Sequence, residues 1–168
     1  MTPKRKLTQK QLDQSVLMFA FGSNMTKPRL AERIGRCEIV GTYELQDFKL
    51  TFDVGSHISS YANVRPCPGD WCEGVIYELT YGQLRILDRY EALYQREHVM
   101  YEGRRLHFYR SHFRPNQWSH LSREYYSLVK LGCLEHKLEK SLAILQEYES
   151  RPALIDWKRE RLYKGEYD

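Results

Sequence analysis

The chain has 168 residues, which is enough for one domain with a buried core, and its 29% charged and 42% hydrophobic residues are typical of soluble globular proteins. No apolar run approaches the roughly 20 residues that span a bilayer, and no apolar segment with a cleavage site follows the basic N-terminus, so we expect a cytoplasmic location and no membrane partner. The net charge of +4 comes largely from the two ends of the chain, where charges mostly form solvated tails, so nucleic acid is an unlikely partner.

The first part of the chain predicts a strand that turns sharply into a helix. Residues 1–15 are polar and basic without a period and predict a flexible leader. Residues 16–21 are apolar on both faces and predict a central strand, which ends in Gly-Ser-Asn at 22–24. Thr26 then has the character of an N-cap for a helix that runs to Ile34. Such a turn leaves backbone N–H groups unpaired near a helix N-terminus, where they attract carboxylates and developing oxyanions.

The middle of the chain predicts extended structure. Pro-Cys-Pro-Gly-Asp at residues 66–70 predicts a turn between two strands. Gly74 lies inside the strand after this turn and indicates a bulge or a close backbone approach. The predicted extended segments are residues 39–45, 48–52, 61–64 and 71–79.

The second half of the chain mixes helices with a hairpin. Thr80 and Gln83 form a capping-box pattern that opens a helix ending near residues 91–92. Two extended runs around the turn at 102–103, residues 95–102 and 104–110, predict a β-hairpin.

From Ser122 the pattern becomes helical, with a break after Gly132. About six strands with helices inserted between them predict an α+β domain with a mixed sheet, comprising residues 16–150. Residues 151–168 form a charged tail.

One carboxylate in the middle of the chain has the position of a catalytic group. Leu84, Leu87 and Glu91 are three and four residues apart, so Glu91 continues the apolar face of its helix. Burial would raise the pKa of this carboxylate, as a general base near neutral pH requires. The alternative is a glutamate of the last turn that pairs with Arg96 or is simply exposed. The four cysteines and six histidines match no common zinc-binding pattern, so we predict free thiols and no metal site.

Four segments together resemble one known family. Residues 21–24, Phe-Gly-Ser-Asn, resemble the Tyr-Gly-Ser-Asn signature of the gamma-glutamylcyclotransferase (AIG2-like) family. The alanine-containing segment at 61–64, the glycine-valine strand at 73–79 and the Leu-Asp-x-x-Glu helix end at 87–91 resemble later blocks of that family in the same order. The similarity runs from about residue 17 to 110 and continues more weakly to residue 136.

The resemblance implies a small closed mixed β-barrel flanked by helices, with a pocket at one end of the barrel. It also implies an enzyme that cleaves a gamma-glutamyl amide, as in glutathione metabolism, and releases 5-oxoproline and an amine or amino acid. This reaction requires no cofactor and takes a small-molecule gamma-glutamyl substrate. Glu91 matches the family's glutamate and would be the general acid and base. The other reading is a non-catalytic module that binds a carboxylated small metabolite.

The resemblance also assigns the residues that would bind the substrate. Tyr94 would donate a hydrogen bond to the substrate, whereas Tyr109 is better explained by core packing. Two positions depart from the family, because Phe21 replaces its usual tyrosine and Ala92 replaces a frequent glycine; they leave the choice of substrate open. The expected binding residues are Phe21, Gly22, Ser23, Asn24, Met25 and Tyr94, of which the turn residues act through their backbone.

Overall fold

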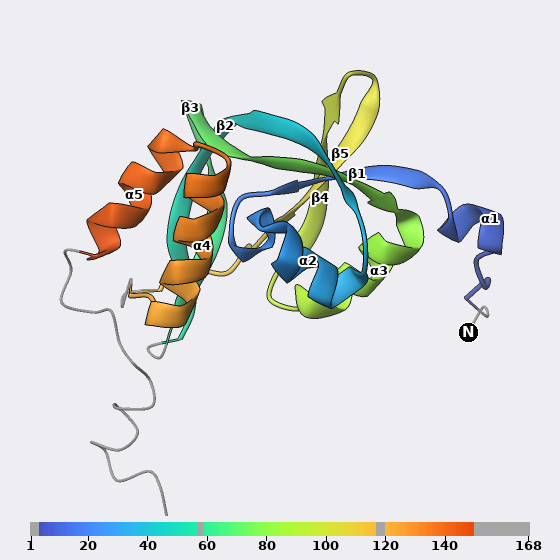
Figure 1. Cartoon of the computed structure of the whole chain (residues 1–168), viewed down its shortest axis with the longest axis horizontal. Coiled ribbons are helices and arrows are strands. Elements are labelled where there is room, and N and C mark those ends of the chain that lie inside the picture. The colour runs from blue at the N-terminus through green and yellow to red at the C-terminus, as the bar shows by residue number, and fades with distance from the viewer. Residues whose placement is uncertain (1–3, 57–58, 117–119, 150–168) are drawn as a thin grey trace, which may run out of the picture.

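The computed structural model describes residues 4–56, 59–116 and 120–149, so the predicted tail at 151–168 lies outside the described residues. A short helix occurs within the predicted leader. In chain order the elements are α1 (Gln9–Leu12), β1 (Ser15–Ala20), the 3-10 helix η1 (Ser23–Met25), α2 (Lys27–Ile34), β2 (Glu38–Gly55), β3 (Ser60–Thr80), α3 (Tyr81–Tyr90), β4 (Gln95–Tyr101), β5 (Arg104–Arg110), α4 (Arg123–Glu135) and α5 (Glu139–Glu149) (Figure 1).

The strands form one mixed sheet in the order β2-β3-β1-β5-β4. Strand β1 is antiparallel to β3 and parallel to β5, and the pairs β2–β3 and β4–β5 are antiparallel. The predicted α+β class with a mixed sheet and flanking helices is confirmed. Among the described residues the sheet has five strands and is open, with β2 and β4 at its edges, whereas the resemblance implied a closed barrel of about six strands.

The strand count differs because β2 and β3 each join segments that the sequence separates. The predicted turn at 66–70 does not end its strand: residues 67–70 stand opposite the single residue Asp47, and pairing then resumes. Asp47 and Gly69 both have positive φ angles, 65° and 84°, and the Gly69 N–H donates to Asp47 Oδ1 over 3.0 Å. The turn residues therefore form a large bulge, and both strands continue past it to form the long bent ribbon of Figure 1.

The end of β1 is fixed by a close approach to β3. A Cβ atom at Gly74 would lie 2.4 Å from the Ala20 carbonyl oxygen and 2.5 Å from the Phe19 ring, distances that real side chains do not reach. This confirms the close backbone approach that the sequence indicates for Gly74. It also sets the position from which the chain enters the Gly-Ser-Asn turn.

The predicted capping box joins α3 to α2. The Gln83 N–H donates to Thr80 Oγ1 and the Thr80 N–H donates to Gln83 Oε1, which confirms the predicted start of α3. The Gln83 side chain also donates to the carbonyls of Ile34 and Arg36, over 3.1 and 2.7 Å. These bonds hold the C-terminal end of α2 against α3, and the two helices lie side by side below the sheet in Figure 1.

The core lies between the sheet and the helices and is rich in aromatic side chains. Phe19, Phe52, Tyr77 and Phe108 come from four different strands, and each is at most 1% exposed. Such large buried side chains supply much of the driving force for folding. Among the described residues, no helix combines the length and the apolar character that crossing a membrane requires.

Candidate active site

The Gly-Ser-Asn turn after β1 forms η1. The Met25 N–H donates to the Gly22 carbonyl over 3.2 Å and closes this turn. The N–H groups of Gly22, Ser23 and Asn24 donate no hydrogen bond to any described residue. The turn therefore presents three backbone donors, whereas the N–H of Met25, the fourth donor expected from the sequence, is used within the turn itself.

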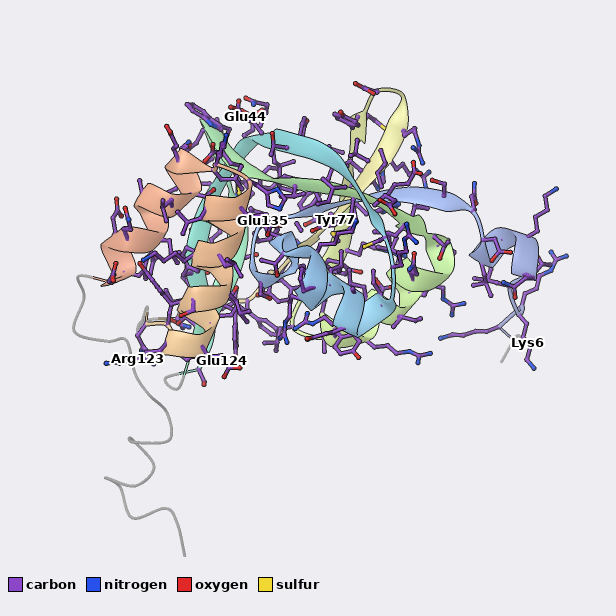
Figure 2. All side chains as sticks on the ribbon, in the orientation of Figure 1. Lys6, Glu44, Tyr77, Arg123, Glu124 and Glu135 are labelled. Atoms are coloured by element: carbon purple, nitrogen blue, oxygen red, sulfur yellow. The ribbon has the colours of Figure 1, made fainter. Side chains whose placement is uncertain are left out.

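The turn is held from behind through Met25. The Met25 side chain is fully buried, and its carbonyl oxygen lies 2.9 Å from the Tyr77 hydroxyl and 2.9 Å from His136 Nε2, both of which can donate to it. Tyr77 is labelled at the centre of Figure 2, where it comes from β3. Gly132 of α4 packs so closely that a Cβ atom there would lie 2.8 Å from the Met25 side chain. Met25 thus supports the turn and does not line a pocket.

A cavity of about 330 Å³ opens in front of the turn. It brings together all of the predicted site residues except Met25, although they come from two separate segments, one after β1 and one after α3. Its walls are mostly aromatic and aliphatic, and its polar groups are few, as is usual for small-molecule sites. The predicted residues that line the cavity are Phe21, Gly22, Ser23, Asn24, Glu91 and Tyr94.

Glu91 ends α3 and points its carboxylate at the turn. Its N–H donates to the Leu87 carbonyl over 3.1 Å, so its backbone is still anchored to the helix. Asn24 Nδ2 donates to Glu91 Oε1 over 2.8 Å, and Arg33 Nη1 donates to the same oxygen over 3.3 Å. No described residue donates a hydrogen bond to Glu91 Oε2. One carboxylate oxygen is therefore held by Asn24 and Arg33 together.

The surroundings of Glu91 shift its proton affinity. Burial raises the pKa of Glu91 above its ordinary value of 4.5, while the Arg33 charge and the Asn24 hydrogen bond act in the opposite direction. Burial also lowers the pKa of Arg33, although a guanidinium stays charged at neutral pH. Arg33 additionally donates to Asn24 Oδ1 over 3.3 Å, which fixes the orientation of the Asn24 amide. The three side chains form one connected polar network.

The structure excludes the alternative pairing of Glu91 with Arg96. Arg96 lies 3.5 Å from Asp88, one turn earlier on α3, and Glu91 pairs with Arg33. Tyr109 donates to Asp88 over 2.7 Å, and its side chain is buried, as core packing requires. Glu91 is thus an inward carboxylate with its own partners.

Two tyrosines fix the part of the cavity wall that Ala62 forms. The Tyr94 hydroxyl donates to the Ala62 carbonyl over 2.7 Å, and the Ala62 N–H donates to the Tyr125 hydroxyl over 2.9 Å. Both tyrosines thereby satisfy the backbone edge of β3 at a point where it pairs only with β2. Burial raises the pKa of both hydroxyls, so both stay protonated. The Tyr94 proton, expected to serve the substrate, is used by the protein.

Gly22 packs closely against this wall. A Cβ atom at Gly22 would lie 3.2 Å from both the Tyr125 hydroxyl and Ala62 Cβ, tighter than ordinary packing. Sequence reasoning did not assign a role to Tyr125 or Arg33. A signal for Arg33 was present, because Arg29 and Arg33 are four residues apart on one face of α2.

The described residues offer no metal site. No group of three or more His, Cys, Asp and Glu side chains in residues 4–56, 59–116 and 120–149 could hold a metal ion. The four cysteines are free, and burial raises the pKa of Cys37, Cys72 and Cys133. These thiols are therefore poor nucleophiles.

Together these features define an α+β domain whose pocket suits a small molecule with anionic groups. A family model described as "Gamma-glutamyl cyclotransferase, AIG2-like" matches residues 18–128, and the chain belongs to this family. The comparison with curated proteins found no match.

Solved structures agree with the family at the level of the fold. A structure named "Gamma-glutamyl cyclotransferase" is 22% identical, with 90% of this chain and 100% of that chain covered and a TM-score of 0.67. An uncharacterized protein from Homo sapiens is 25% identical, covering 83% and 89% of the two chains, also with a TM-score of 0.67. YkqA from Bacillus subtilis is 19% identical, with coverages of 83% and 56% and a TM-score of 0.69.

Proposed function

We propose that this protein is a cofactor-independent gamma-glutamyl cyclotransferase that converts a gamma-glutamyl amide into 5-oxoproline and a free amine or amino acid. The observation that carries the proposal is the position of Glu91. Its carboxylate lies in one cavity with the backbone donors of the turn, bonded to Asn24 over 2.8 Å, although 67 residues separate the two in the sequence.

The chemistry needs little beyond positioning and proton transfer. The nucleophile is the substrate's own α-amino group, already tethered to the γ-carbonyl that it attacks, so the enzyme holds the folded conformer and supplies a base. A C–N bond forms between the α-nitrogen and the γ-carbonyl carbon, and the amide C–N bond then breaks. One proton leaves the attacking nitrogen and one reaches the departing nitrogen, so no net proton is consumed.

Glu91 has the features of the group that carries this proton. Its Oε1 is held by Asn24 and Arg33, so Oε2 is the oxygen available to take the proton from the α-nitrogen and return it to the leaving nitrogen. Burial raises its pKa toward neutrality, which makes both transfers easier. Arg33 and Asn24 act as positioning residues in this account.

The turn would stabilise negative charge on the substrate. The backbone N–H groups of Gly22, Ser23 and Asn24 are free of partners among the described residues and lie at the same cavity. Such preorganised donors stabilise a tetrahedral oxyanion or hold a carboxylate. Phe21 lines the cavity but has no hydroxyl, so the backbone carries this role.

The test is to identify the product. The protein is incubated with gamma-glutamyl amino acids and gamma-glutamyl amines in ¹⁸O-labelled water, and the products are analysed by mass spectrometry. Cyclisation releases unlabelled 5-oxoproline, because no water enters the bond-breaking step. Labelled glutamate would identify a hydrolase and overturn the proposal. Saturable binding without any product would instead identify a non-catalytic pocket.

A further inference from the structure

One positive charge at the cavity is not used by the network around Glu91. The charged residues that line the cavity are Arg29, Arg33 and Glu91. Arg33 and Glu91 pair with each other. Arg29 forms an ion pair with Glu32 over 3.9 Å, but the Glu32 side chain is 71% exposed, so this pair contributes little.

The protein also leaves Arg29 incompletely hydrogen-bonded. Its Nε is buried and has no hydrogen-bond partner among the described residues. A buried donor without a partner is energetically unfavourable and calls for an explanation. One explanation is an anionic ligand that compensates the guanidinium. The Arg29 guanidinium thus brings a largely uncompensated charge to the cavity.

Arg29 lies closer to solvent than the proposed proton carrier. It is one helical turn from Arg33 on the same face of α2, and its side chain is 34% exposed, against 14% for Glu91. Tyr90 and Leu93, which also line the cavity, are about half exposed, so the cavity reaches solvent among its partly exposed lining residues, of which Arg29 is one. The glutamyl half of the substrate must lie inward, between Glu91 and the turn. The leaving group therefore extends outward, past Arg29.

On the basis of the proposed function, we propose that Arg29 binds a carboxylate on the leaving group, so that the substrates are gamma-glutamyl amino acids or peptides and not gamma-glutamyl amines. A planar guanidinium binds a carboxylate through two parallel hydrogen bonds, and an amine leaving group offers it no partner. The glutamyl α-carboxylate has its own donors in the turn. Arg29 is then a residue that determines specificity.

The experiment compares two substrates that differ in this carboxylate. Gamma-glutamyl-alanine and gamma-glutamyl-ethylamide share the same skeleton except that alanine carries a carboxylate. We expect Arg29→Gln to lower kcat/KM for the alanine compound about 10- to 100-fold, the range of one charge-assisted hydrogen bond, and for the ethylamide less than about threefold. For each protein we take the ratio of kcat/KM for the alanine compound to kcat/KM for the ethylamide. Comparing this ratio between wild type and variant cancels the different basicities of the two leaving groups.

The controls separate the charge of Arg29 from its structural effect. Arg36→Gln removes the same charge from an exposed position outside the cavity, and it should leave the ratio unchanged. Arg29→Lys keeps the positive charge but lacks the two parallel donors of the guanidinium. It should therefore retain part of the preference for the alanine compound over the ethylamide. If Arg29→Gln lowers kcat/KM equally for both substrates, or for neither of them, the proposal is overturned.

Two further readouts cover the remaining cases. If Arg29→Gln does not fold, product inhibition of the wild-type protein decides: L-alanine should inhibit better than ethylamine, and equal inhibition overturns the proposal. If neither substrate is turned over, the proposed function fails. Calorimetric affinities of wild type and Arg29→Gln for the same two compounds then test Arg29 separately, and an unchanged affinity ratio overturns its role.

Discussion

Two arginine–carboxylate pairs of this protein have nearly the same burial but different geometry. In the pair that joins β2 to β3, Arg65 donates from Nε and Nη2 to the two oxygens of Asp53 over 2.9 and 2.8 Å. In the cavity, Arg33 contacts one oxygen of Glu91 over 3.3 Å. The side chains are 18% and 11% exposed in the first pair and 17% and 14% in the second.

The two pairs differ in how the carboxylate oxygens are used. Both carboxylate oxygens of Asp53 accept hydrogen bonds from the planar guanidinium of Arg65, and this two-point contact holds the two strands together. Glu91 uses one oxygen on Asn24 and Arg33, and its second oxygen has no donor among the described residues. Similar burial therefore goes with a two-point ion pair between strands in one place, and with the carboxylate of the proposed proton acceptor in the other.

The largest expected effect is on the rate, at Glu91. Glu91→Gln keeps the shape and the Oε1 contacts but cannot accept a proton, so we expect kcat for 5-oxoproline release to fall about 10³-fold. Asp53→Asn should change kcat of the folded protein by less than about threefold, because Asp53 does not line the cavity. Equal rate losses in the two variants would contradict the distinction.

The second effect is on stability, at Asp53. Asp53→Asn leaves Arg65 without its charged partner in a largely buried site, and we expect a loss of about 3 kcal/mol in the free energy of unfolding. Urea unfolding followed by circular dichroism measures this loss. Glu91→Gln serves as the control and should cost much less, because the raised pKa of Glu91 shows that its charge is already disfavoured in the folded protein. A larger loss in Glu91→Gln would reverse the comparison.

A smaller effect is expected at Arg33. Arg33→Gln removes the charge that lowers the pKa of Glu91, so this pKa rises further. We expect kcat/KM at neutral pH to fall about tenfold and the acidic limb of its pH profile to move to higher pH. Arg33→Lys keeps the positive charge, so it should return the acidic limb most of the way to its wild-type pH. A loss of activity without any movement of the limb would mean that Arg33 acts only through the fold.

The smallest effect is the pH dependence of stability. Burial raises the pKa of Glu91 in the folded protein above the ordinary value of 4.5 that applies to the unfolded chain. At a pH between the two pKa values, the folded protein holds a proton that the unfolded chain has released. The contribution of Glu91 to stability therefore falls as pH rises through this window. Unfolding free energies from pH 4 to 8 should show wild type losing stability relative to Glu91→Gln. A difference that is constant with pH would contradict the raised pKa.

Much of the fold could be predicted because its signals are local. The capping box at Thr80 and the positive φ angles at Glu102 and Gly103 in the hairpin depend on a few neighbouring residues. At Gly74 the glycine inside a strand is the local signal, although the atoms that approach it belong to Phe19 and Ala20 of another strand. The change of chain direction at residues 66–70 is also a local feature, as the sequence predicts. The sequence alone could not show that β2 restores the pairing beyond it, because that depends on a partner strand about twenty residues away.

The site was predictable in part for the same reason. The inward position of Glu91 follows from its spacing to Leu87, and the open turn follows from Gly-Ser-Asn. The pairing with Arg33 joins residues 58 apart, and the Tyr94 hydroxyl meets a backbone carbonyl of β3 that no sequence pattern identifies. Hydrogen-bond partners across elements depend on the packing of the helices against the sheet.

In the proposed mechanism, ionised Glu91 accepts the proton during cyclisation. This role is tested most directly by following the ¹³C signal of the Glu91 carboxyl with pH, assigned by its absence in Glu91→Gln, beside kcat/KM for 5-oxoproline release. We expect this carboxyl to titrate above pH 4.5 and the acidic limb of kcat/KM to have the same midpoint. A rate that stays constant while Glu91 titrates would contradict this mechanism.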